Sequence, residues 1–136
     1  MPVLPSLSPV NDIPAASSGE AHAHFSRLLT FETDCWDVHT SLKQPDPGFV
    51  VLDVRSPEHF ARGHVPGAIS LPHRLITERT LAAYGPETLF VVYCDGPHCN
   101  GADRAAIRLS KLDRPVKKMI GGIEGWKDEG FELAND

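Results

Sequence analysis

Hydrophobic and polar positions follow two alternating patterns along most of the chain. Three short apolar runs, rich in β-branched residues and bounded by turn-forming residues, predict buried strands. The runs cover residues 49–54, 89–93 and 116–120. Helix-like hydrophobic spacing covers residues 21–29, 33–42 and 102–112. Strands that alternate with helices favour crossover connections and a mostly parallel sheet covered on both faces, so the pattern predicts an α/β fold.

Local signals predict where some of these helices begin and end. Thr33 or Asp34 is expected to cap the helix over residues 33–42, which must stop before Pro45. A further helix is expected to start after Ser56, because Ser56-Pro57-Glu58 combines a capping side chain with proline in the first turn.

Chain length and the first residues predict one domain with a flexible leader. The 136 residues fit a single domain with one hydrophobic core. Prolines and serines dominate residues 1–20, a composition that resists helix and sheet. We therefore expect a flexible tail over residues 1–20 and one domain over residues 21–136. The first residues lack the positive and long apolar regions of a secretory signal, which favours a cytoplasmic location.

Charge and composition narrow the expected partners. The hydrophobic content is 41%, but no apolar run approaches the roughly 18 residues needed to cross a bilayer. The formal charge of -5 is spread along the chain without a basic cluster in the sequence, so neither nucleic acid nor membrane is expected as a partner. Three cysteines are too few for a secreted disulfide framework. Small molecules and proteins are the expected partners.

Cys94 is the strongest candidate for chemistry. It ends the predicted strand over residues 89–93, and after a short loop the next helix begins. Free backbone N–H groups and the positive end of a helix dipole stabilise anions at such a position, and they lower a cysteine pKa toward the reactive thiolate. The alternative is a purely structural role. Free cysteine is among the most buried residue types, and Cys94 would then be a packing residue at the end of a buried strand.

Several separated motifs resemble those of the rhodanese-like sulfurtransferase family, in matching order and spacing over residues 31–133. They are Val51-Leu52-Asp53-Val54-Arg55-Ser56-Pro57-Glu58-His59-Phe60, Gly63-His64-Val65-Pro66-Gly67-Ala68-Ile69, Val91-Val92-Tyr93-Cys94, and residues 116–126 with Gly121-Gly122 and Gly125-Trp126. The resemblance implies a central parallel sheet of about five strands with helices on both faces. It also implies that Cys94 carries sulfur as a persulfide within a loop of backbone amides.

The loop after Cys94 both fits the family and departs from it. The residues expected to bind the substrate are Asp95, Gly96, Pro97, His98, Cys99, Asn100 and Gly101, with Asp53 and Arg55 as supporting residues. The loop has the length found in the sulfurtransferases and is one residue shorter than in the rhodanese-fold phosphatases. The usual loop arginine is replaced by Cys99, and Arg104 lies several residues into the next helix. The resemblance therefore argues against phosphatase chemistry, which needs that planar arginine fork.

Asp95 and Cys99 leave two questions open: which compound donates the sulfur, and how the sulfur leaves Cys94. Asp95 places negative charge where thiosulfate would bring two more, and a protonated His98 would offset it. Cys99 has three readings: a packing residue, a resolving thiol that attacks the Cys94 persulfide, or part of a metal pair. The seven histidines show no zinc pattern with the cysteines, so no metal is expected, and no organic cofactor is required.

The function predicted from these residues is sulfur transfer. The Cys94 thiolate is expected to take sulfane sulfur from thiosulfate, mercaptopyruvate or a persulfide and to pass it to a thiophilic acceptor. Its partners are a small-molecule donor and acceptor, or a protein acceptor. Two alternatives stay open: a catalytically weak regulatory or protein-binding module, and a Cys94/Cys99 redox pair.

Overall fold

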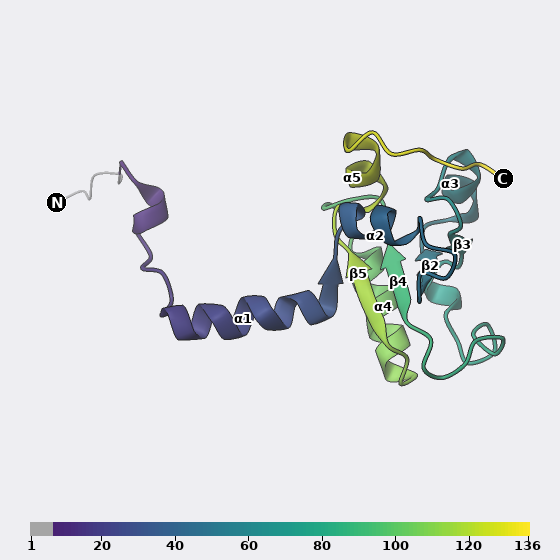
Figure 1. Ribbon diagram of the computed structural model, residues 1–136, viewed down its shortest axis with the longest axis horizontal. Coiled ribbons are helices and arrows are strands. Elements are labelled where there is room, and N and C mark those ends of the chain that lie inside the picture. Colours follow the sequence, from purple (N-terminus) through teal and green to yellow (C-terminus); the bar gives the residue numbers. More distant parts are fainter. Residues whose placement is uncertain (1–6) are drawn as a thin grey trace. The chain divides into compact units, whose positions relative to one another are not determined.

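Five parallel strands build the sheet of the computed structural model, which describes residues 7–136 (Figure 1). The strands are β1 (Glu32–Thr33), β2 (Val50–Asp53), β3 (Ile69–Ser70), β4 (Phe90–Tyr93) and β5 (Val116–Met119). Their order in the sheet is β1-β5-β4-β2-β3. Because every pairing is parallel, each connection crosses over a face of the sheet.

Helices cover both faces of this sheet. They are α2 (Cys35–Ser41), α3 (Pro57–Arg62), η2 (His73–Leu75), α4 (Gly101–Lys111) and α5 (Gly122–Asp128). One buried cluster joins Val38 of α2 and Trp126 of α5 to the sheet, and the other joins Leu109 of α4 to its opposite face. The predicted α/β fold with a five-stranded parallel sheet between helices is confirmed.

Strand β4 lies at the centre of the sheet and supplies both cores. Val91 and Tyr93 point into the cluster beneath α2 and α5, whereas Phe90, Val92 and Cys94 point into the cluster beneath α4. All four strand residues are buried, which explains why this segment is an unbroken apolar run rather than an alternating one. The same alternation sends the Cys94 side chain toward α4.

The cap signals were partly right. The Ser56 side chain accepts a hydrogen bond from the N–H of His59 at the start of α3, as predicted. Asp34 caps α2 by accepting from the N–H of Asp37, so that helix spans Cys35–Ser41 rather than residues 33–42. Thr33 belongs to β1 instead, where its carbonyl accepts from the N–H of Ile120.

The N-terminal part differs from the prediction. Helix α1 spans Ser18–Phe31, and a short 3-10 helix, η1, spans Pro9–Asn11. The predicted boundary at residue 20 thus falls inside α1, because the Ser17 side chain accepts from the N–H of Glu20 and starts the helix early. The chain divides into one compact unit that ends at Thr30 and another over Phe31–Asp136. Residues 1–6 of the predicted tail lie outside the described residues.

Within residues 7–136, no helix combines the length and the apolar character that a bilayer crossing requires.

Candidate active site

Cys94 lies at the carboxyl end of β4, where three strand ends meet. Asp53 of β2 is in register with Tyr93 of β4, and Val92 of β4 is in register with Lys118 of β5. The carbonyl of Cys94 accepts a hydrogen bond of 3.0 Å from the N–H of Ile123, which joins the strand end to the start of α5. Cys94 itself is 7% exposed. Its sulfur is therefore held against the start of α4 by neighbours on both sides.

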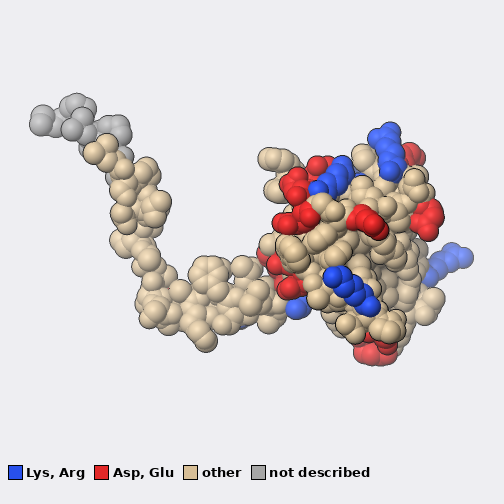
Figure 2. All heavy atoms as spheres, turned by 45° about the horizontal axis from the view of Figure 1, so that its top comes forward, with Lys and Arg blue, Asp and Glu red and all other residues tan. Residues whose placement is uncertain are grey.

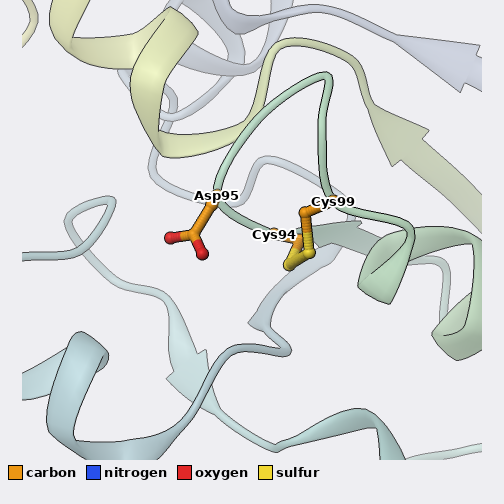
Figure 3. A group of neighbouring side chains, drawn as sticks. All are labelled: Cys94, Asp95 and Cys99. Carbon is orange, nitrogen blue, oxygen red and sulfur yellow. A yellow bond between two sulfur atoms is a disulfide. The ribbon is translucent and has the colours of Figure 1, made fainter.

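The loop after Cys94 folds back so that Cys99 meets it. Cys94 and Cys99 form a disulfide, with Cα atoms 6.5 Å apart, and the Asp95 carboxylate lies within 4.8 Å of both sulfurs (Figure 3). The N–H of Cys99 donates to the carbonyl of Gly96, and the N–H of Gly101 lies 3.4 Å from the Cys99 sulfur. The turn therefore brings the second thiol to the first and places an amide donor beside the sulfur pair.

A cavity of about 370 Å³ opens over the two sulfurs. It is lined by Cys94, Gly96, Pro97, Cys99, Ala102, Asp103, Lys118, Met119, Ile120, Gly121 and Gly122. The volume lies at the small end of the range for ligand pockets, which suits a small sulfur compound or a single side chain of a partner.

Two glycines allow this close packing. A Cβ at Gly101 would lie 2.8 Å from the Cys94 sulfur, a distance that real Cβ atoms essentially never show. A Cβ at Gly122 would overlap the carbonyl oxygen of Cys94, and Gly122 also has a positive φ of 59°. Both positions require glycine for the same reason, since a side chain at either would displace the loop that carries Cys94.

Asp53 and Arg55 form a buried ion pair beside this loop. Arg55 Nε lies 3.0 Å from Asp53 Oδ1, and Arg55 Nη2 lies 2.7 Å from Asp53 Oδ2. Arg55 also donates to the carbonyl of Gly63 at 2.8 Å, and its Nη1 lies 3.5 Å from Asp95 Oδ1. The pair thus fixes the turn after β2 and also reaches the active loop through Asp95.

The same carboxylate accepts from Tyr93. The Tyr93 hydroxyl donates to Asp53 Oδ2 at 2.7 Å and accepts from the N–H of Val65 at 3.1 Å. Burial and the negative charge of Asp53 raise the pKa of Tyr93 above its usual range, so the phenol remains a neutral donor. Burial lowers the pKa of Arg55, but its hydrogen bond to Asp53 and the charge of that carboxylate outweigh this effect and raise it overall.

The predicted substrate-binding residues do not converge on one cavity. Gly96, Pro97 and Cys99 line the cavity over the sulfurs, whereas Asp95 lines a neighbouring groove with Arg55. Asn100 lines a third depression, between η2 and α4. His98 is exposed and lines none of these three.

Sequence reasoning missed two contributors to the site. Lys118 lines the cavity and donates to Asp103 Oδ1 at 2.9 Å, which holds positive charge near the sulfurs. Its signal was the pair Lys117-Lys118 between the apolar residues Val116 and Met119 of β5. Arg104 donates from α4 to the Asn100 side chain at 3.1 Å, so an arginine does contact the loop, although from the helix.

Cys94, Asp95 and Cys99 are the only three His, Cys, Asp or Glu residues within residues 7–136 whose ligand atoms cluster closely enough for a metal. Three ligands are one fewer than a closed structural zinc site uses, and sulfurs bonded to each other are not thiolate ligands.

Comparison with known proteins now identifies the family. The model of the rhodanese-like domain family matches residues 37–129, which include β2, β4, the loop with Cys94 and α5. The chain belongs to the rhodanese-like domain family. Among solved structures, the BH2092 protein of Bacillus halodurans is 39% identical, with a TM-score of 0.83 over 87% of this chain and 86% of that one.

Other relatives of this rhodanese-like domain are larger proteins. The thiosulfate sulfurtransferase of Pseudomonas aeruginosa is 26% identical with a TM-score of 0.62, over 85% of this chain and 21% of that one. A protein of Mycobacterium tuberculosis named as the HTH-type transcriptional regulator Rv0324 is 33% identical over 93 residues. That alignment covers 68% of this chain and 41% of the regulator, so the chain matches well under half of the curated relative.

Proposed function

We propose that this rhodanese-like domain is a sulfurtransferase in which the reduced Cys94 thiolate carries sulfur as a persulfide. The observation that carries the proposal is the position of the Cys94 sulfur, at the end of a central parallel strand, under a small cavity and against the start of α4. An anion on this sulfur faces the first amides and the positive dipole end of an 11-residue helix. The solved thiosulfate sulfurtransferase of similar fold supports the same chemistry.

The transfer takes two steps. With thiosulfate as donor, the Cys94 thiolate attacks the outer sulfur, the S–S bond of the donor breaks, and sulfite leaves with the bonding electron pair. The enzyme then holds Cys94–S–S⁻. In the second step an acceptor thiolate attacks the terminal sulfur, and the Cys94 thiolate is the leaving group. No net oxidation of the protein occurs, and mercaptopyruvate or a persulfide enters the same cycle as donor.

Cys99 allows a second reaction of the Cys94 persulfide. If the Cys99 thiol attacks the inner sulfur of the persulfide, hydrosulfide leaves and the Cys94–Cys99 disulfide forms. This bond is the one present in the structure, which supports the resolving-thiol role over simple packing. An external dithiol must then reduce the disulfide before another cycle, so this branch consumes two electrons for each sulfide released.

The experiment that tests sulfur transfer is intact-protein mass spectrometry. The protein is reduced with dithiothreitol, desalted, and incubated separately with thiosulfate, mercaptopyruvate and glutathione persulfide. The expected result is the added mass of one sulfur atom in Cys99→Ser and in Cys35→Ser combined with Cys99→Ser, but not in Cys94→Ser. In the wild type, Cys99 displaces part of this sulfur as hydrosulfide and leaves the Cys94–Cys99 disulfide. If alkylation shows the Cys94 thiol to be free and reactive, yet no donor adds sulfur, the proposal is refuted.

The disulfide also favours a second candidate, a redox pair that cycles without sulfur. The two functions separate in Cys99→Ser: sulfur loading on Cys94 should persist in this variant, and sulfide release without an added thiol should stop. A redox pair predicts instead a reversible disulfide in the wild type and no sulfur adduct in either protein. Absence of both activities would favour a binding module, a role to which the name of the mycobacterial regulator points.

A further inference from the structure

A cationic groove lies between η2 and α4, next to the active loop. It has a volume of about 700 Å³ and is lined by His73, Arg74, Asn100, Arg104, Ile107, Arg108 and Lys111. Four of the 13 Lys and Arg residues of the chain line it, and none of the 18 Asp and Glu residues does. This concentration is unexpected in a chain with a formal charge of -5.

Helical spacing and the fold together create this cluster, because Arg104, Arg108 and Lys111 recur at intervals of four and three residues along α4. The sequence shows no basic run, but the connection from β3 to β4 places η2 against α4, and Arg74 thereby joins the exposed face of a helix that lies 30 residues further on. Elsewhere the signs of charge are mixed, as on the face drawn in Figure 2. The expectation that the chain lacks a basic cluster is therefore corrected by its tertiary structure.

The cations in the groove lack acidic partners. Among residues 7–136, no carboxylate lies within ion-pair distance of Arg74, Arg108 or Lys111. Burial and the positive charges of Arg74, Arg104 and Arg108 lower the pKa of His73. The groove thus holds a positive field that the domain itself leaves uncompensated.

The groove begins at the last residue of the loop between Cys94 and Gly101. Asn100 lines the groove, and Gly101, the next residue, lies against the sulfurs of Cys94 and Cys99. From Asn100 to Lys111 the groove follows α4 for about 16 Å, at 1.5 Å per residue. A ligand that fills the groove therefore ends at the residue before Gly101, next to the loop that carries Cys94, while the sulfur itself faces a separate cavity.

We propose that this groove binds an acidic segment of the protein that donates sulfur to, or accepts it from, Cys94. The inference rests on the proposed function and adds the class of partner. Five or six extended residues, at about 3.3 Å each, span the same length as the groove. Glu and Asp side chains along such a segment pair with the arginines, and Ile107, which is 53% exposed, offers one apolar contact.

A protein segment fits the groove better than nucleic acid does. No Phe, Trp or Tyr lines the groove, so stacking platforms for bases are absent from it. The overall negative charge of the chain also opposes a long polyanion, whereas a short acidic segment meets only the local field.

The test compares a charge-reversed groove with a matched surface. Arg74→Glu combined with Arg108→Glu changes one residue on each wall, and both residues are exposed. Lys43→Glu combined with Arg79→Glu makes the same change in net charge at exposed or half-exposed positions outside the groove. Each protein is reduced, checked for folding by circular dichroism, and titrated into fluorescein-labelled hexaglutamate, hexaglutamine and a short DNA duplex.

Fluorescence anisotropy measures the binding of the labelled peptides and DNA independently of sulfur transfer. The expected result is that hexaglutamate binds the wild type, that hexaglutamine does not, and that the groove variant binds roughly tenfold more weakly, while the control changes little. A second arm measures transfer from the Cys94 persulfide to hexaglutamate and hexaglutamine peptides that each carry one cysteine. The acidic acceptor should react faster with the wild type, and this advantage should disappear in the groove variant.

The outcomes separate the two proposals. Equal weakening in both charge variants, equal rates with both acceptor peptides, or tighter groove-dependent binding of DNA would each overturn the acidic-segment proposal. If no donor loads sulfur on Cys94 but hexaglutamate still binds through the groove, the sulfurtransferase proposal fails and the groove remains a site for acidic segments without that chemistry.

Discussion

Replacing Arg55 by methionine should strongly destabilise the domain. The Arg55 side chain is 6% exposed and Asp53 is fully buried, so the change leaves a buried carboxylate without its cation. The lost contacts are the two-point pairing with Asp53 and the bond to the carbonyl of Gly63. Removing one partner of a buried ion pair costs about 3 to 5 kcal/mol.

The surroundings of Asp53 place the loss at the lower end of that range. Asp53 keeps two donors in the variant, the backbone N–H of residue 55 at 3.0 Å and the Tyr93 hydroxyl at 2.7 Å. We therefore expect about 3 kcal/mol, a large part of the 5 to 15 kcal/mol that typically stabilises a domain.

The assay is urea unfolding followed by circular dichroism, with reductant present so that the Cys94–Cys99 bond does not contribute. Asp53→Asn combined with Arg55→Met is the matched control, because it removes the uncompensated charge. This double variant should be more stable than Arg55→Met alone. A loss below about 1 kcal/mol in the single variant, or a double variant that is less stable still, would refute the reasoning.

Two crowded glycines and the buried thiol of Cys35 offer three further tests. Gly101→Ala should lower the free energy of unfolding by about 1 to 2 kcal/mol and alter the alkylation rate of the active-site thiol, whereas Gly19→Ala, with nothing within 4 Å, should not destabilise. Gly122→Ala should lower the free energy of unfolding by about 3 kcal/mol. Gly130→Ala should lower it by only about 1 kcal/mol, because Gly130 also has a positive φ but an added Cβ there meets nothing within 4 Å. Urea unfolding measures both losses. Burial, followed by the charges of two nearby carboxylates, raises the pKa of Cys35 from 9.0 to about 11. Between these pH values the unfolded chain releases a proton that the folded chain keeps, so stability should fall as pH rises, and less so in Cys35→Ser; equal pH profiles would contradict this.

Local patterns in the chain predicted the elements that carry the site. The apolar runs around β2 and β4 are short-range signals, because burial on both faces demands β-branched and apolar residues at consecutive positions. The position of Cys94 at a strand end and the Ser56 cap of α3 were also predictable, because both depend on residues close together in the sequence. The position of a candidate nucleophile at the carboxyl edge of a parallel sheet follows from strand order alone.

Contacts between distant segments settled the rest. Lys118 reaches the cavity because β5 pairs with β4 in one particular register, and this register cannot be predicted from the sequence alone. The disulfide depends on how the loop folds back, and Arg55 reaches Asp95 only because β2 lies beside β4. The cationic groove arises when η2 packs on α4. Each of these features is set by packing between residues far apart in the chain, whereas β2, β4 and β5 and the helices α2, α3 and α4 follow from hydrophobic spacing and caps within a few residues.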